Sequence, residues 1–338
     1  MKNKIIGIFV CMLLITACVV PVVGELISVK KSSNDNNPRA SNNTELKFMI
    51  AGKAIRFLRS YWFHVPPSYD GSKAVPLVIV LHGATPFDLK DPLGFFRSNW
   101  QENYSEFSEK ADEVGFIVVY PNAKLILLHL KYEYDPEYYP AWIYKFTDDV
   151  GFIRDLINKM EHEYTINSSR IYVTGFSSGG MMSYSIGAYL SDIVAAIASV
   201  AGTIGMRWSG DEPYYYIPTP ANPVSVIAFH GTNDSDISYN GSLFVVSVNK
   251  SISFWVEHNR CNPVPEINTS ASGKIIRKIY TNGENGTEVL LYTTVGGNHW
   301  WPGNHWTFAP GYSFLIDTIQ EISATDLIWE FFAAHPKQ

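Results

Sequence analysis

The chain has 338 residues, of which 46% are hydrophobic and 14% aromatic, and its formal net charge at pH 7 is −6. This length and apolar content are sufficient for one large domain with a buried core. The acidic balance, without any basic cluster, argues against nucleic acid as a partner.

The N-terminal residues have the pattern of an export signal. Two lysines within the first four residues precede an uncharged run that ends at Val23, and a glycine follows. We interpret residues 1–24 as a secretory signal peptide and expect a secreted, extracellular protein. Two alternatives stay open. The run is long enough to remain as a membrane anchor, and residues 15–18, which end in Cys18, resemble a bacterial lipoprotein cleavage box.

The chain after the signal divides into a linker and one domain. Residues 25–43 are interpreted as a polar linker, because Ser, Asn, Asp and Lys dominate from Lys30 onward without an apolar period. Residues 44–338 form the expected catalytic domain. Of the three cysteines, only Cys261 lies in this domain. We expect it to be a buried structural thiol rather than a nucleophile.

Strand and helix patterns alternate along the domain. They predict an α/β fold, in which a mostly parallel sheet carries helices on both faces. The expected strands are an antiparallel pair within 45–65, then 75–81, 116–120, 171–174, 193–200, 224–229, 274–281 and 288–294. The expected helices are 95–113, 150–164, 252–260 and a last one that begins at a capping box at Ser323 and runs to Phe332.

A Gly-x-Ser-x-Gly pattern lies between an expected strand and an expected helix. The segment Gly175-Phe176-Ser177-Ser178-Gly179 follows the β-branched run 171–174 and precedes small residues and methionines. In this context the pattern is typical of a sharp turn that exposes the central serine above a sheet edge. Glycines two residues to either side leave room for such a turn. We therefore interpret Ser177 as a nucleophile, because its rival Ser178 is not flanked by glycines at both of these distances.

A carboxylate and a histidine follow this serine in the order expected of an α/β-hydrolase. Asp234 lies in the loop after one buried strand, and His299 lies in the loop after the last strand. Catalytic groups of such sheets lie beyond the carboxyl ends of the strands, so the three residues are expected to meet there. His82-Gly83-Ala84 follows the strand 75–81, in the loop that supplies one backbone N–H of the oxyanion hole.

The chain resembles the secreted polyhydroxybutyrate depolymerase and feruloyl or acetylxylan esterase family of α/β-hydrolases. The resemblance spans nearly the whole domain and implies the α/β-hydrolase fold. It matches Ser177 to the nucleophile, Asp234 to the acid and His299 to the base, with the backbone N–H groups of Ser178 and Ala84 as oxyanion donors. No cofactor and no metal are expected. The segments that carry it are Leu81-His82-Gly83, Asp148 to Ile153, Gly175 to Gly180, His230 to Asp234, Ser238 to Gly241, and Gly297 to Gly303.

Two members of the expected triad have rivals nearby. Asp236 competes with Asp234, and the spacing usual in the family favours Asp234. His305 repeats the Asn-His-Trp sequence of His299, and the glycine before His299 and the Trp-Pro-Gly after it favour His299. The chain departs from the family where Asn298 replaces a usual glycine.

Other polar residues of these segments have simpler interpretations. His230 is interpreted as a structural residue at a strand end. Asp148 and Asp149 precede a helix and are interpreted as its N-terminal cap. The loop after Gly83 also departs from the family, because it lacks the usual glycine-rich run.

Aromatic residues crowd the segments around 132–146, 208–216 and 300–306. Aromatic walls would suit a feruloyl ring, a sugar face or a polyester chain. We expect Trp142 and Trp300 to line the substrate cleft. The alternative is that most of these rings pack the lid against the sheet.

The sequence therefore predicts a secreted serine esterase that acts through an acyl-enzyme on polysaccharide-linked esters or on a polyester. Two alternatives come from other classes. A serine peptidase of the same fold would share the triad, yet it would also need acidic residues to hold a peptide amine. A non-catalytic carbohydrate-binding protein would keep the aromatic residues and would need no Ser, Asp and His.

Overall fold

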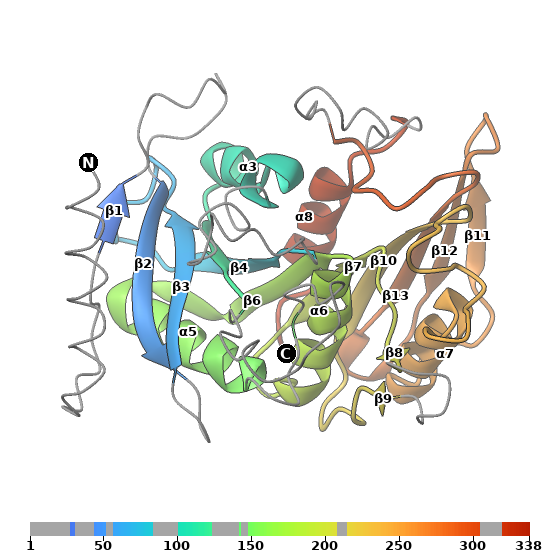
Figure 1. Ribbon diagram of the computed structural model, residues 1–338, viewed down its shortest axis with the longest axis horizontal. Coiled ribbons are helices and arrows are strands. Elements are labelled where there is room, and N and C mark those ends of the chain that lie inside the picture. Colours follow the sequence, from blue (N-terminus) through green and yellow to red (C-terminus); the bar gives the residue numbers. More distant parts are fainter. Residues whose placement is uncertain are drawn as a thin grey trace, which may run out of the picture.

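The computed structural model describes residues 28–30, 44–51, 57–83, 101–123, 142, 148–207, 215–304 and 320–338. Its framework is an eleven-stranded sheet with the order β1-β2-β3-β5-β4-β6-β7-β10-β13-β12-β11 (Figure 1). The strands are β1 (Ser28–Lys30), β2 (Thr44–Ala51), β3 (Phe57–His64), β4 (Val75–Leu81), β5 (Ile117–Pro121), β6 (Ile166–Phe176), β7 (Ala196–Val200), β10 (Ser225–Gly231), β11 (Glu266–Thr269), β12 (Ile275–Tyr280) and β13 (Val289–Thr294).

The six central strands, from β5 to β13, run parallel to one another. The strands outside them pair antiparallel at both edges. A separate two-stranded sheet joins β8 (Gly205–Met206) to β9 (Tyr215–Tyr216). The mostly parallel sheet that the alternation of patterns predicts is confirmed.

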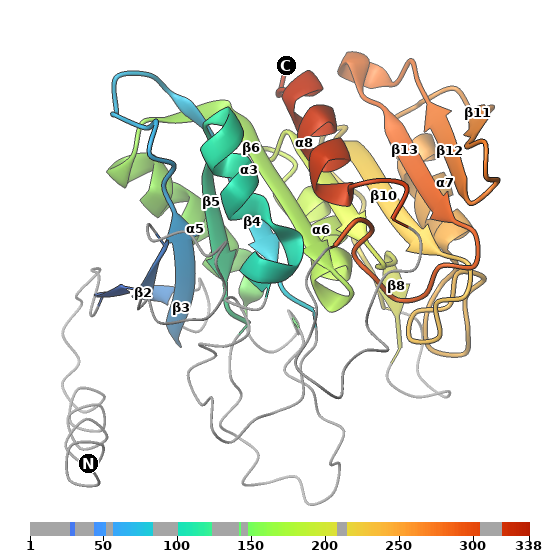
Figure 2. The ribbon, with the colours of Figure 1, turned by 90° about the horizontal axis from the view of Figure 1, so that it is seen from above.

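Helices cover both faces of this sheet (Figures 1 and 2). α5 (Asp149–Glu163), α6 (Ser178–Tyr189) and α7 (Val248–His258) lie on one face, and α3 (Phe107–Val114) and α8 (Ala324–Ala334) lie on the other. Each face has its own apolar core. Along β4, for example, Leu77 and Ile79 enter the core under α5 and α6, while Val78 enters the core under α3 and α8. This alternation explains why the buried strands read as continuous apolar runs.

Most predicted elements are confirmed within a few residues, and β4 has the predicted bounds. Residues 95–100 of the predicted helix 95–113 lie outside the described residues. The rest is wrong in its continuity, because Glu106 has a φ of 53° and separates helical residues 101–105 from α3. A helix cannot continue through a left-handed residue. The sequence pattern does not predict β11, because its four residues are exposed and it lies at the edge of the sheet, where it pairs with β12.

The N-terminal segments are only partly described. Ser28–Lys30 lies within the predicted linker, yet it pairs antiparallel with β2 as β1. The predicted signal segment 1–24 lies outside the described residues. Among the residues that are described, no helix is both long and apolar enough to cross a membrane.

A buried ion pair ties β3 to α5. The Arg59 guanidinium contacts the Asp149 carboxylate, and both side chains are 1% exposed. Arg59 also lies over the Phe152 ring, with its Cζ 4.2 Å from the ring centroid. The cap predicted for this helix is confirmed at Asp148, whose side chain accepts a hydrogen bond from the Gly151 N–H at 3.1 Å. Asp149, instead of capping, is the first helical residue.

Cys261 is buried beneath the end of α7, as predicted. Burial, with Glu288 nearby, raises the pKa of its thiol to about 11 from the ordinary 9.0. At pH 8 the thiolate is then about 100-fold scarcer than for an ordinary cysteine. We therefore expect Cys261 in the native protein to resist a thiol reagent at pH 8 and to react at once in denaturant. Fast native labelling that disappears in Cys261→Ser would contradict this.

Candidate active site

The turn between β6 and α6 holds Ser177 in a strained conformation. Ser177 precedes the first helical residue and has φ 56° and ψ −120°. Positive φ causes steric strain in a non-glycine residue, and such strain is typical of functional turns. The Ser177 N–H donates to the Val200 carbonyl of β7 at 2.8 Å, which fixes the turn to the neighbouring strand. Ser177 therefore stands at the carboxyl edge of the sheet, at the N-terminus of α6.

Two glycines make this turn possible. A Cβ placed on Gly175 would lie 2.5 Å from the Gly179 carbonyl carbon, and one placed on Gly179 would lie 2.2 Å from the Leu81 oxygen. No real Cβ fits at such distances, so any other residue would push the start of α6 away from β4 and β6. The two glycines therefore avoid a steric clash in this turn, as the sequence pattern predicts.

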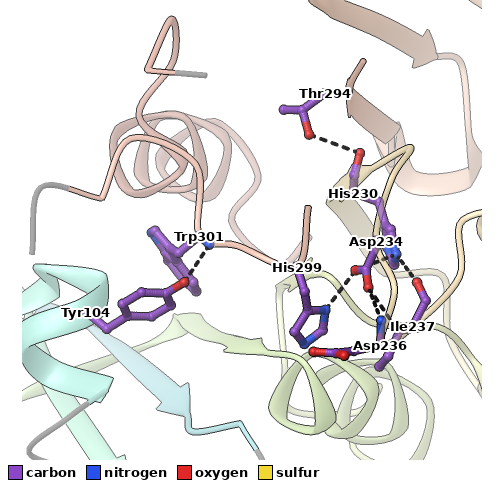
Figure 3. A network of polar contacts seen from close by, with 8 residues as sticks. All are labelled: Tyr104, His230, Asp234, Asp236, Ile237, Thr294, His299 and Trp301. Atoms are coloured by element: carbon purple, nitrogen blue, oxygen red, sulfur yellow. Dashed lines mark hydrogen bonds and ion pairs between the residues drawn. The ribbon is translucent and has the colours of Figure 1, made fainter. Parts of the chain in front are cut away.

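Asp234 and His299 meet beyond the ends of β10 and β13. The His299 Nδ1 lies 2.7 Å from the Asp234 Oδ2, as Figure 3 shows. The Asp234 side chain is fully buried, whereas the His299 side chain is 13% exposed. β10 and β13 are adjacent parallel strands, so their following loops lie side by side. Because a carboxylate only accepts, the His299 Nδ1 carries the proton and leaves Nε2 as the basic nitrogen.

The Asp234 carboxylate is held by several donors. Its Oδ1 accepts the backbone N–H groups of Asp236, at 3.0 Å, and Ile237, at 2.7 Å. Burial alone would raise the pKa of this carboxyl. The hydrogen bonds and charges of His230 and His299 outweigh it and hold the pKa well below the ordinary 3.8. Asp234 is therefore ionised at every pH at which the protein would be assayed.

His299 also lies beside the serine turn. The ring of Phe176, the residue before Ser177, has its centroid 4.9 Å from that of His299. The structure records no hydrogen bond between the side chains of Ser177 and His299. In triads this bond often tightens only in the substrate complex. The structure therefore brings the acid and the histidine into contact and places them next to the serine.

The loop that carries His299 is anchored at a second point. The Trp301 N–H donates to the Tyr104 hydroxyl at 3.1 Å (Figure 3). The Trp301 indole N–H donates to Thr325 Oγ1 at 2.9 Å. Tyr104 also packs edge-on against Phe176 at 5.1 Å. No sequence pattern indicates Tyr104, since 197 residues separate it from Trp301.

The predicted oxyanion loop runs beside Ser177. A Cβ on Gly83 would lie 3.3 Å from the Ser177 Cβ. The His82 Nε2 accepts the Ala123 N–H at 3.0 Å, so its Nδ1 carries the hydrogen that is donated to the Gly83 carbonyl at 2.7 Å. The Trp142 indole N–H donates to the His82 carbonyl at 2.9 Å.

These contacts change the interpretation of Trp142, which the sequence suggests as a wall of the substrate cleft. Its ring is 5% exposed and lies 5.1 Å from the His82 ring. The structure thus gives Trp142 a supporting place behind the oxyanion loop. Trp300, the second expected wall, is 8% exposed, so it offers little surface to a ligand.

Of the other predicted residues, the structure describes Ser178 and Asp236. Ser178 begins α6, so its backbone N–H has no partner within the helix. The side chain of Asp236, the rival acid, is exposed, while Asp234 is buried against His299. Ala84 and His305 lie outside the described residues. Among the described residues, no group of three or more His, Cys, Asp or Glu is arranged to hold a metal ion.

The chain is similar in sequence to known esterases and to a depolymerase. Feruloyl esterase B of Piromyces equi is 30% identical over 243 residues, which are 69% of this chain and 41% of that protein. A poly(3-hydroxybutyrate) depolymerase of Ralstonia pickettii is 30% identical over 147 residues, 42% of this chain and 28% of that protein. The chain thus spans less than half the length of these two relatives. No protein-family model matches it.

Solved structures support the fold. An acetyl xylan esterase from Aspergillus awamori superposes with a TM-score of 0.50 and 14% identity, covering 81% of this chain and 94% of that one. At such low identity the likeness concerns the fold alone. Together with the sheet topology and the strained serine turn, it confirms the predicted α/β-hydrolase architecture.

Proposed function

We propose that this chain, a member of the feruloyl esterase, acetylxylan esterase and polyhydroxybutyrate depolymerase family of α/β-hydrolases, hydrolyses carboxylic esters with Ser177, His299 and Asp234. The observation that carries the proposal is the 2.7 Å hydrogen bond between His299 Nδ1 and Asp234 Oδ2, formed beside the strained turn of Ser177. A buried acid on a partly exposed histidine next to such a serine is the arrangement of a serine hydrolase.

The chemistry proceeds in two halves. His299 Nε2 removes the Ser177 proton as Oγ attacks the ester carbonyl carbon, and the carbonyl oxygen becomes an oxyanion. His299 then protonates the departing alcohol oxygen, which leaves an acyl group on Ser177. A water molecule, deprotonated by His299, then attacks the acyl carbon. The bond between that carbon and Ser177 Oγ breaks, His299 returns the proton to Oγ, and the acid is released. Asp234 holds the imidazole in the required tautomer throughout.

Two backbone groups are proposed to receive the oxyanion. One is the N–H of Ser178, at the N-terminus of α6, where the helix dipole also favours negative charge. The other is the N–H of Ala84, which follows the anchored loop of His82 and Gly83. Removing one such donor raises the barrier by about 3 kcal/mol in comparable sites.

The proposed substrates are esters carried by a polymer. Relatives named for feruloyl ester and poly(3-hydroxybutyrate) cleavage support this class. The export pattern of residues 1–24 is consistent with polymeric substrates, because these lie outside the cell. We accordingly propose secretion, with an uncleaved or lipidated N-terminus as the alternative that would keep the protein on the membrane.

Side-by-side hydrolysis of four substrates tests the proposal. These are a short p-nitrophenyl ester, methyl ferulate, acetylated xylan and amorphous polyhydroxybutyrate, each corrected with the rate of Ser177→Ala. We expect turnover of the short ester and a preference for one of the other three. Release of acid from none of the four would overturn the esterase proposal and favour a peptidase or a binding protein.

A further inference from the structure

His230 occupies an unusual place for a residue at a strand end. It lies at the carboxyl end of β10, four residues before Asp234, and its side chain is 1% exposed. Its Nε2 lies 2.7 Å from the Ile237 carbonyl oxygen and 3.2 Å from Asp234 Oδ2. A carbonyl oxygen only accepts, so Nε2 must carry a hydrogen. The hydrogen bond runs to the Ile237 carbonyl, and the Asp234 carboxylate lies within ion-pair distance of the same nitrogen.

The carboxylate of Asp234 therefore receives donors on both oxygens. Two backbone N–H groups bind Oδ1, while His299 and His230 share Oδ2 (Figure 3). An ionised carboxylate has about four lone-pair sites, and this set uses all of them. With every site used, the carboxylate cannot rotate about its Cβ–Cγ bond without breaking bonds on both oxygens.

The His230 ring is itself fixed from the side. The Tyr239 ring meets it edge-on, with centroids 5.9 Å apart. The Tyr239 hydroxyl is engaged elsewhere, 3.0 Å from Thr293 Oγ1. His230 thus has one short hydrogen bond to the backbone of the loop that carries the acid and one longer contact with the acid itself.

We propose that His230 is a positioning residue for the esterase reaction, whose Nε2–H holds the Asp234 carboxylate in the orientation that receives the His299 Nδ1–H. The inference rests on the proposed function and concerns a residue that touches neither substrate nor reacting atoms. Its effect passes entirely through Asp234. Loss of the donor leaves Oδ2 to His299 alone, so the carboxylate is held less firmly on that side and the imidazole is misaligned in the transition state.

Replacing His230 by glutamine or by asparagine tests the hydrogen-bond donor separately from the imidazole ring. Both variants lose the ring, but only glutamine keeps an N–H donor at the same reach. The amide nitrogen of glutamine is as many bonds from Cα as the Nε2 of histidine, whereas that of asparagine is one bond shorter. We expect His230→Asn to lower kcat about 10-fold with KM changed less than 2-fold, and His230→Gln to keep kcat within about 3-fold. Tyr239→Phe, which keeps the ring and removes only the hydroxyl, is the matched control and should keep kcat.

Two further measurements distinguish positioning from general packing. In an Asp234→Asn background, His230→Asn should cause no further loss of kcat, because residues that act through one another are not additive. The downfield proton resonance of the His299–Asp234 hydrogen bond should shift in His230→Asn and persist in His230→Gln. Should His230→Asn fail to fold, the glutamine variant decides alone: a kcat loss beyond 3-fold, or a lost resonance, overturns the proposal.

The results of these experiments distinguish a failure of the positioning role from a failure of the proposed function. Full kcat in a folded His230→Asn, with Ser177→Ala inactive, would overturn the positioning role and leave the esterase proposal intact. An additive loss in the Asp234→Asn background would likewise overturn it. Equal turnover by the native protein and Ser177→Ala would instead overturn the proposed function.

Discussion

Replacing Ser177 by alanine is expected to lower kcat about 10⁶-fold, the loss seen when the serine of a triad is removed. The variant keeps the same backbone strain, with φ near 56°, and loses only a hydroxyl that makes no hydrogen bond within the described residues. Its thermal unfolding temperature should therefore change little. The measurement is single-turnover and steady-state hydrolysis of a p-nitrophenyl ester, with the fold checked by circular dichroism.

Ser178→Ala is the control for this variant. Among the described residues the buried Ser178 hydroxyl has no hydrogen-bond partner, and the proposed role of Ser178 belongs to its backbone N–H. Its removal should cost far less than that of Ser177. If the two alanine variants lose activity equally, or if Ser177→Ala keeps its turnover, Ser177 is not the nucleophile.

Asp234→Asn is expected to lower kcat about 10⁴-fold while the protein stays folded. An asparagine amide has only one acceptor oxygen, and its NH₂ group can face His299 Nδ1 instead. The imidazole then carries its hydrogen on Nε2, which is the wrong tautomer for a base. The backbone N–H groups of Asp236 and Ile237 still find an oxygen. KM should change much less than kcat, because the acid orients the base and does not bind substrate.

Asp236→Asn is the matched control, two residues away on the same loop. Its side chain is exposed, and only its backbone contacts Asp234. We expect its kcat to stay within about 2-fold of the native value. A large loss in Asp236→Asn together with a small loss in Asp234→Asn would reverse the assignment of the acid.

The fold could be predicted from the sequence because its signals are local. Apolar runs such as 75–81 mark strands that are buried on both faces, and the glycines around Ser177 mark the turn. Ser177, Asp234 and His299 follow the strands β6, β10 and β13, so their order along the chain is the order of these strands. The exposed edge strand β11 and the break at Glu106 leave no such pattern, so the sequence does not predict them.

The surroundings of the site could not be predicted, because they depend on side chains that meet only in the folded protein. The indole of Trp142 supports the His82 carbonyl across 60 residues of sequence. The strand-end position predicts a structural role for His230, yet its contact with Asp234 depends on how the loop up to Ile237 folds back. Residue type and spacing do not report such orientations.

The position of His299 has a consequence for how activity arises during folding. The residue that anchors its loop, Tyr104, and the residue that it contacts, Asp234, are separated from the loop by 197 and 65 residues. Contacts so distant in sequence form late, after the costly closure of long chain segments. A chain folded only as far as β7 would display Ser177 without a base. Recovery of ester turnover during refolding should thus lag behind the recovery of secondary structure.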